Sequence, residues 1–366
     1  MIGRLERYVL GRTLTAVAGA LAVIGGMITL VEFVDISKNI GVRSDDAGFG
    51  SLLYLTLLKA PATVLALGPF VFLFGTLFAF VGLNRRSELI AMRAAGVSAW
   101  RFILPAAAAA LLIGVLTVTA LNPITAWLTA RYETASTELM EGYLANIDKP
   151  SWLRQGDANT QIVIRAARRD RQDDSLHLRG VSLFVFTRGA NGALEFSRRI
   201  EASDARLVAG FWRLNNVREA LPGAGSLSSE SLSIPSTLDQ QSANERFGAP
   251  GSVAFWRLPG AIGRTEQAGF SATAYRLRLQ QLFATPLLFA AMSILAAAFS
   301  LRLMRLGGLA VLAGSGVALG FVIFFFNQLC EALGKSEVLF PFAAAWAPPV
   351  LALLAGFTLL CYTEDG

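Results

Sequence analysis

The sequence predicts an integral membrane α-helical bundle of six transmembrane helices, with an extracytoplasmic all-β, jelly-roll-like domain inserted in its middle. Hydrophobic residues make up 54% of the 366 residues and charged residues only 16%, and the mean hydropathy is +0.52. A soluble domain averages about 25% charged residues. The apolar residues are also gathered in long runs on both sides of a polar central segment. Together these observations exclude an ordinary soluble protein.

Each apolar run is long enough to cross a membrane, because one crossing needs about 20 mostly apolar residues. The stretches without Asp, Glu, Lys or Arg are 13–31, 60–83, 102–130, 279–300, 307–330 and 339–362. The second span is expected to begin near Leu52, to contain Lys59 and to kink at Pro61 and Pro69. The third exceeds the membrane thickness and is expected to bend at Asn122-Pro123. The first run is longer than a secretory signal, which predicts a retained anchor.

Basic residues in the short loops predict the orientation, because cytoplasmic loops carry an excess of Lys and Arg. With the N-terminus inside, the outer loops hold only Lys38, Arg43 and Lys335. The inner loops then hold Arg4, Arg7, Arg12, Arg85, Arg86, Arg93, Arg101, Arg302 and Arg305. The sequence therefore predicts cytoplasmic N- and C-termini. Most of the net charge of +6 would then lie beside anionic lipid.

The polar segment over 131–270 has the pattern of a β domain, between helical parts at 1–130 and 271–366. Alternating apolar residues at 161–165 and 181–185, and the segment 211–214, predict strands. The Gly/Ser-rich segment 221–230 is expected to be a loop. A sandwich or jelly-roll is the expected architecture. Basic and acidic residues are nearly balanced here, which argues against a nucleic-acid surface.

Several kinds of chemistry are excluded by residue type. The chain has a single histidine, His177, which excludes zinc sites of the HExxH type, so no metal site is expected. A Ser/His/Asp centre has no support either, so no catalytic residues are expected. Gly334-Lys335-Ser336 resembles the end of a P-loop, but Leu329 occupies the position of its first glycine. The chain is therefore expected not to be an enzyme and to bind no cofactor itself.

The loop 85–98 is predicted to form a short amphipathic helix on the cytoplasmic face. Ser87 is expected to cap it, Glu88 to lie in its first turn and Gly96 to end it. One interpretation is a helix that lies on the membrane surface and is anchored by arginines. The other interpretation is a helix that docks into a cytoplasmic partner protein.

The motif Arg86-Ser87-Glu88-Leu89-Ile90-Ala91-Met92-Arg93-Ala94-Ala95-Gly96, after the second span, resembles the signature of the LptF/LptG permeases. The order of three spans, a β domain and three spans also resembles this family, over the whole chain. Phe33-Val34-Asp35 followed by Lys38 is closer to the LptG branch. The LptG-like relatives have lysine immediately before this motif, where this chain has Glu32, so a phosphate contact is not carried over to that position.

The resemblance implies a permease subunit of the ABC transporter that extracts lipopolysaccharide from the bacterial inner membrane. It implies an LptB-like ATPase dimer that holds ATP and Mg, an LptF-like second permease, and an LptC-like protein that receives lipid from the periplasmic β domain. The residues that would couple to the ATPase are Arg86, Ser87, Glu88, Met92, Arg93 and Gly96. Spans one and five would form lateral gates, where small residues allow close packing: Gly314, Gly316 and Gly320.

A cavity for lipopolysaccharide needs an apolar wall and basic residues that bind phosphate at its outer rim. The candidates are Lys38, Lys59, Arg131, Arg276 and Arg278. Each could instead be an interfacial residue that reaches the lipid headgroups. Lys59 is the strongest candidate, because a charge within a span faces protein or water. An alternative function is a mechanotransmitter or assembly protein that an ATPase drives without transporting lipid; it would need no such cavity.

Overall fold

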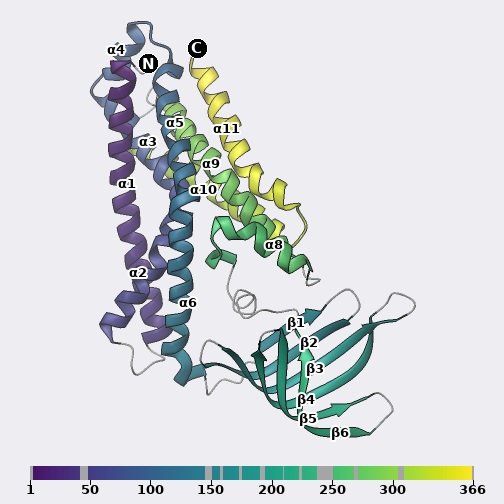
Figure 1. Ribbon diagram of the computed structural model, residues 1–366. Helices are drawn as coiled ribbons and strands as arrows, with labels where there is room; N and C mark the ends of the chain where they lie inside the picture. Colours follow the sequence, from purple (N-terminus) through teal and green to yellow (C-terminus); the bar gives the residue numbers. More distant parts are fainter. Residues whose placement is uncertain are drawn as a thin grey trace.

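The computed structural model describes residues 3–41, 48–144, 151–156, 160–172, 175–189, 194–208, 210–221, 225–236, 250–267, 271–303 and 309–364. In this part of the chain it has seven helices that are long and apolar enough to cross a membrane, and one antiparallel β-sheet. Both chain ends and the short helix α4 lie at one end of the helical bundle, and the sheet lies beyond the other end (Figure 1). The predicted helical bundle with an inserted β domain is confirmed.

The second predicted span is divided, so that six predicted spans become seven apolar helices. Helix α1 (Arg4–Ile36) ends in a π-helical turn, Ser37–Gly41. It is followed by α2 (Phe49–Ala66) and α3 (Gly68–Arg85), which are joined through Leu67 alone and both pack against α1. Pro69 lies in the first turn of α3, where its missing N–H costs no hydrogen bond. The break therefore lies beside one of the two prolines expected to kink this span.

The third span is long and irregular near its predicted bend. It consists of α5 (Ala99–Leu116), a π-helical turn (Thr117–Leu121) and α6 (Asn122–Leu144). Pro123 has no N–H to donate to the Thr119 carbonyl, as a helix would require. The indole Nε1 of Trp256 donates to this carbonyl instead, at 3.1 Å. The Phe255 backbone N–H donates to Asn122 Oδ1 at 2.8 Å, so residues that follow the sheet in the chain support the irregular turn.

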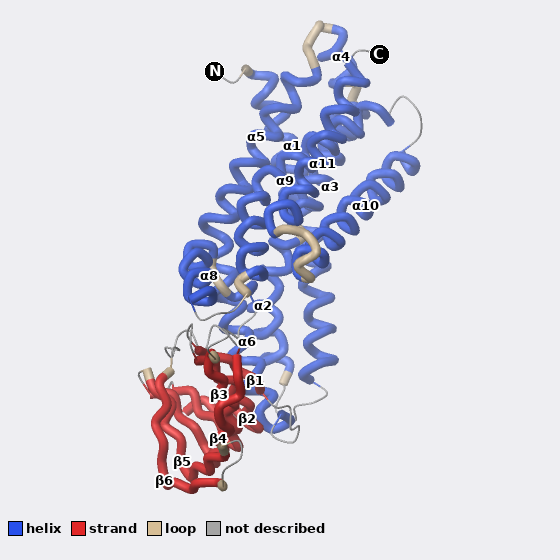
Figure 2. The backbone as a smooth tube through the Cα atoms, turned by 90° about the vertical axis from the view of Figure 1, so that its right-hand side faces the viewer, coloured by secondary structure: helices blue, strands red, loops and turns tan. Residues whose placement is uncertain are grey.

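Helix α9 lies at the centre of the second half of the bundle. The elements after the sheet are two 3₁₀ turns (Pro250–Ser252 and Phe255–Arg257), α8 (Leu258–Gln267), α9 (Thr273–Leu303), α10 (Leu309–Lys335) and α11 (Pro341–Glu364). Helix α9 packs against α3, α5 and α11, and a hydrogen bond of 3.0 Å joins Ser293 to Thr76 of α3 inside this core. Helix α10 diverges from the other helices (Figure 2).

The six strands form one antiparallel sheet in sequential order. They are β1 (Ser151–Gly156), β2 (Thr160–Gln172), β3 (Ser175–Arg188), β4 (Leu194–Val208), β5 (Phe211–Ala220) and β6 (Ser226–Pro235). The three predicted strand segments lie in β2, β3 and β5 and are confirmed. The prediction of a loop over 221–230 is wrong from Ser226 onward, because β6 pairs with β5 there through its backbone while most of its side chains face solvent.

The sheet curls around its own apolar face (Figure 1). Trp212, Leu183 and Ile164 are buried in this face. The Gln155 side chain of β1 links it to β6: Gln155 Oε1 accepts from Trp212 Nε1 at 2.9 Å and from the Ser236 hydroxyl at 2.8 Å, and its amide donates to the Pro235 carbonyl at 3.3 Å. A jelly-roll has two sheets, whereas the described strands form a single curled sheet.

The described strands occupy a shorter part of the chain than the predicted domain at 131–270. Helix α6 continues to Leu144, beyond the end of its apolar run. Helix α8, near the other end of this segment, packs against α9 of the bundle. Helices therefore extend from the bundle toward the sheet on both sides of the insertion.

Candidate functional site: the two polar ends of the helical bundle

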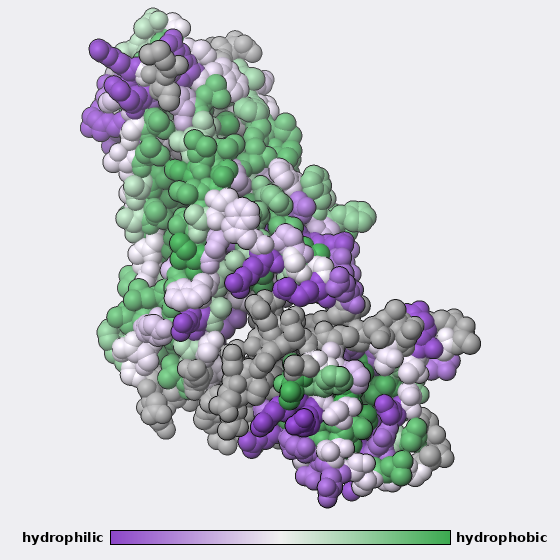
Figure 3. Space-filling model, viewed as in Figure 1, coloured by the Kyte–Doolittle hydropathy of each residue, from purple (hydrophilic) through white to green (hydrophobic). Residues whose placement is uncertain are grey.

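Apolar side chains cover the middle of the helical bundle, and hydrophilic side chains gather at the α4 end and where the helices approach the sheet (Figure 3). The predicted ATPase-coupling residues lie at the α4 end. The predicted phosphate-binding residues lie on the elements that extend toward the sheet. These two ends, about the length of a membrane span apart, are described in turn.

Helix α4 (Glu88–Ala94) begins and ends in left-handed backbone. Ser87, at its N-cap, has φ 56° and its side chain makes no capping hydrogen bond, so the predicted cap is wrong. A capping residue normally has extended backbone, whereas the turn from α3 holds Ser87 in the left-handed region. Gly96 has φ 79°. Its N–H donates to the Arg93 carbonyl, and the next N–H, of Val97, donates to the Met92 carbonyl. This is a Schellman motif, so the prediction that Gly96 ends the helix is confirmed.

One face of α4 is anchored in the bundle and the other is presented outward. Leu89 is 1% exposed and packs with the core that α1, α3, α5, α9 and α11 share. Glu88 Oε2 accepts from the Tyr8 hydroxyl of α1 at 2.9 Å, and Arg12 Nε donates to the same hydroxyl at 3.3 Å. Ile90, in contrast, is 60% exposed. An exposed isoleucine on a rigidly held helix is a surface that a protein partner can cover.

The structure separates the predicted coupling residues. Met92 packs partly buried against the core beneath α4. Glu88 and Arg93 are half-buried, and Ser87 and Arg86 are exposed. Arg86 makes no hydrogen bond or ion pair to the described residues, and it lines a cleft between α1 and α3. The outward face of α4 therefore consists of Ile90 with neighbouring alanines.

At the other end of α1, Lys59 is bound within the chain. Its Nζ lies 2.7 Å from Glu32 Oε2 and 3.5 Å from Asp35 Oδ2, both on α1. Glu32 Oε1 also accepts from the Thr63 hydroxyl at 2.7 Å. The Lys59 ammonium lies 5.8 Å from the ring centre of Tyr132 on α6. Lys59 thus joins α1, α2 and α6, and its charge is balanced by two carboxylates.

The other predicted rim residues fall into two groups. Lys38 and Arg131 are exposed near the Lys59 cluster, and the Arg131 guanidinium lies 5.3 Å from the Trp127 ring centre. Arg276 and Arg278 lie apart on α9. Arg276 pairs with Glu266 of α8 at 2.6 Å, whereas the Arg278 Nε is buried and has no hydrogen-bond partner in the described chain. The five residues therefore do not form one basic rim within this chain.

A short polar contact joins the start of α9 to the loop between α10 and α11. The Ser271 hydroxyl donates to Glu337 Oε1 at 2.7 Å. Hydrogen bonds from Ser271 and Thr273 hold the pKa of the Glu337 carboxyl below its ordinary value. A lowered pKa means that this contact stabilises the fold at neutral pH and is lost as the pH falls through the folded-state pKa.

Two of the three predicted gate glycines lie at a close helix crossing. A Cβ added at Gly316 would lie 2.6 Å from Leu77 Cδ2, and one at Gly320 would lie 3.0 Å from Leu73 Cδ2. Both leucines belong to α3, so α10 crosses α3 at two positions where α10 has glycine. Gly314 also lies in α10. Small residues let these two helices approach closely, as in other membrane helix pairs.

Comparison with known proteins decides the family. The sequence pattern of the "Lipopolysaccharide export system permease LptF/LptG" family matches residues 7–362. The chain belongs to this family. The LptG permease of Escherichia coli strain K12 is 24% identical over 374 residues, which cover 98% of both chains. The LptG permease of Haemophilus influenzae strain Rd is 23% identical over 366 residues, or 97% of this chain and 96% of the relative.

Several contacts of this LptF/LptG family member were not predicted from its sequence. The Glu32–Lys59 pair joins residues far apart in the chain, and no sequence pattern indicated that these two side chains meet. The contact of Tyr8 with Glu88 has no sequence signal either. The hydrogen bond from Trp256 to Thr119 does have a sequence signal. A proline such as Pro123 within a helix leaves the carbonyl four residues earlier without its helical donor, so another donor is expected there.

The described residues of the permease offer no group of three or more His, Cys, Asp or Glu side chains that could hold a metal ion. Glu32 and Asp35, two carboxylates of α1, are instead paired with Lys59. Gly334 of the P-loop-like tripeptide lies at a helix crossing, where a Cβ would be 2.8 Å from Ala344 Cβ. Close packing accounts for this glycine without a bound nucleotide.

Replacing Lys59 with methionine is expected to lower the free energy of unfolding by about 1–3 kcal/mol, because Glu32 would keep a charge without its cation in a largely buried place. The double variant Glu32→Gln, Lys59→Met should recover most of this loss. Thermal unfolding in detergent measures both. Lys38→Met, at an exposed position, is the control and should change little. Equal stability of Lys59→Met and the natural chain would contradict the structural role of the pair.

Proposed function

We propose that this chain is the permease subunit, of the LptG type, of an ABC transporter that extracts lipopolysaccharide from the bacterial inner membrane and passes it toward a periplasmic bridge. A separate cytoplasmic ATPase, related to LptB, binds ATP and Mg and supplies the energy. A second, LptF-like permease completes the membrane channel, and an LptC-like protein receives the lipid. The chain itself carries out no chemical step.

The observation that carries this proposal is the whole-chain match to the permease family, together with the placement of α4. The match covers residues 7–362, which includes both helical halves and the sheet. Helix α4 lies at the far end of the bundle from the sheet (Figure 1). In this proposal α4 is cytoplasmic, the chain ends are cytoplasmic and the sheet is periplasmic. A force applied to α4 then acts on α1 and α3 through Leu89 and Glu88.

Transport needs two states of the cavity with different contacts to the lipid. ATP binding by the paired ATPase subunits would press on α4 and narrow the space between this permease and its partner. The lipid would leave toward the curled sheet, whose apolar face suits acyl chains. Because Lys59 is paired within the chain, the phosphates of the lipid would be bound by Lys38, Arg131 and basic residues of the second permease.

Native mass spectrometry of the intact complex tests this proposal. The tagged full-length chain is purified in mild detergent from its own cells and weighed together with whatever remains bound. We expect two copies of an ATPase, one different permease of similar size and a retained lipopolysaccharide mass. A complex with the ATPase but with no lipid would favour a mechanotransmitter. A homodimer that retains neither the ATPase nor lipopolysaccharide would contradict the proposal.

A further inference from the structure

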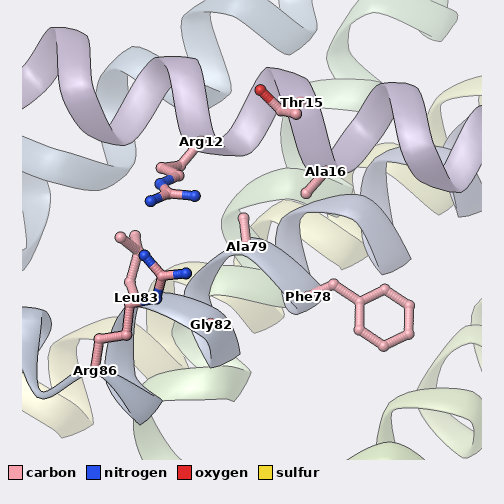
Figure 4. A pocket seen from close by; sticks show the side chains of 8 residues that line it. All are labelled: Arg12, Thr15, Ala16, Phe78, Ala79, Gly82, Leu83 and Arg86. Carbon is pink, nitrogen blue, oxygen red and sulfur yellow. The ribbon is translucent and has the colours of Figure 1, made fainter.

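Helices α1 and α3 touch in the middle of the bundle and separate toward α4. A Cβ added at Gly75 would lie 2.5 Å from Val17 Cα, so the two backbones are in contact there. Two turns further along α3, a Cβ added at Gly82 would meet nothing within 4 Å. A cleft of about 230 Å³ opens between the two helices at this level (Figure 4). Its wall consists of Thr15, Ala16, Phe78, Ala79, Gly82 and Leu83.

Two arginines and no acidic residue line the mouth of this cleft: Arg12 of α1 and Arg86 after α3. Their guanidinium groups point toward one another across the opening (Figure 4). Arg12 donates through Nε to Tyr8, which leaves its terminal nitrogens for another acceptor. Arg86 has no hydrogen bond or ion pair within the described chain. Two facing cations repel each other, and an anion bound between them offsets this electrostatic repulsion.

The depth of the two arginines matches the headgroup region of a bilayer. Arg12 directly precedes the apolar run that starts at Thr13, and Arg86 follows the run that ends at Leu83. The mouth of the cleft is therefore charged and its wall is apolar, with small residues where the helices separate. Basic pockets between membrane helices bind anionic lipid headgroups.

We propose that this cleft binds one anionic phospholipid from the leaflet on the α4 side. Its phosphate lies between Arg12 and Arg86, and the start of one acyl chain lies against Ala79 and Gly82. The hydrogen bonds from Arg12 to Tyr8 and from Tyr8 to Glu88 connect this lipid site to α4. The inference needs only that the helices span a membrane, so it does not depend on lipopolysaccharide export.

Native mass spectrometry of the full-length chain with added phosphatidylglycerol or phosphatidylcholine tests the site. We expect preferential binding of phosphatidylglycerol. Arg12→Gln and Arg86→Gln should each weaken it roughly fivefold, the factor that corresponds to about 1 kcal/mol per basic residue near the headgroups. Arg85→Gln removes a neighbouring charge outside the cleft and is the matched control, which should leave the affinity unchanged.

A second pair of variants tests the apolar wall. Gly82→Leu fills the cleft while keeping both arginines and should also weaken phosphatidylglycerol binding. Gly19→Leu, on α1 where a Cβ again meets nothing within 4 Å, is its control. Circular dichroism and gel filtration of each variant establish that it is folded.

Four results would overturn the proposal. The first is equal affinity for the two lipids, and the second is an equal loss in Arg85→Gln, which would indicate diffuse surface charge. The third is full competition by inorganic phosphate, which would indicate a free-anion site. The fourth is loss of phosphatidylglycerol when the complex assembles, which would assign the cleft to a protein partner.

Discussion

Replacing Gly75 by alanine is expected to lower the free energy of unfolding by about 1–3 kcal/mol, the usual cost of overpacking a core. The added Cβ would lie 2.5 Å from Val17 Cα and 2.9 Å from Val17 N, and both atoms belong to backbone. A side chain could move aside, but backbone atoms move only with the whole helix. Helices α1 and α3 would therefore have to separate along their contact, which would disturb the apolar core that contains Val17.

The matched control is Gly82→Ala in the same helix, where the new Cβ meets nothing within 4 Å. Alanine favours helix over glycine by about 1 kcal/mol, so this variant should be as stable as the natural chain or slightly more stable. Thermal unfolding of both variants in one detergent gives the comparison. A Gly75→Ala variant that melts with or above Gly82→Ala would show that the two helices do not touch as described.

Replacing Glu88 by alanine is expected to reduce ATPase association at least tenfold and to leave the membrane helices folded. Glu88 is one of the residues that the family resemblance assigns to ATPase coupling, and a charge-assisted hydrogen bond contributes about 1.5–3 kcal/mol. The helix itself remains held by Leu89 and by its Schellman motif at Gly96. Pull-down of the ATPase by the purified permease measures the effect. Unaltered association and export would contradict the assigned role.

Tyr8→Phe separates a docking role of Glu88 from a structural one. This variant removes the hydroxyl that donates to Glu88 but keeps the carboxylate. If Glu88 contacts the ATPase, Tyr8→Phe should lose much less association than Glu88→Ala. Equal losses in the two variants would mean that Glu88 acts only by attaching α4 to α1.

The sequence was sufficient for features that depend on local pattern. Apolar runs predicted the spanning helices, alternation predicted β2, β3 and β5, and Gly96 predicted the end of α4. Strand β6 was not predicted, because its serines carry no alternation and its position depends on pairing with β5. The prediction that Ser87 caps α4 was wrong for a similar reason. The backbone of Ser87 is set by the turn that leads from α3 into α4, which the residue types alone do not determine.

The predicted phosphate-binding residues show more clearly what could not be predicted from the sequence. A lysine inside an apolar run predicts a functional charge, and Lys59 fits that description. Its partners Glu32 and Asp35 lie on another helix, and their distance from Lys59 depends on how α1 and α2 pack. The burial of Arg278 and its separation from the Lys59 cluster likewise follow from helix packing. The role of each basic residue therefore required the three-dimensional structure.

ATP-dependent cross-linking of lipopolysaccharide to the β domain tests the transport role most directly. A photo-reactive residue is placed at Leu232 of β6, which packs at the edge of the apolar face of the sheet. The complete complex is then reconstituted into vesicles that contain lipopolysaccharide. We expect a cross-link that forms with ATP, does not form without it and is lost in Glu88→Ala. ATP hydrolysis by the complex with no cross-linked lipopolysaccharide would contradict transport through this permease.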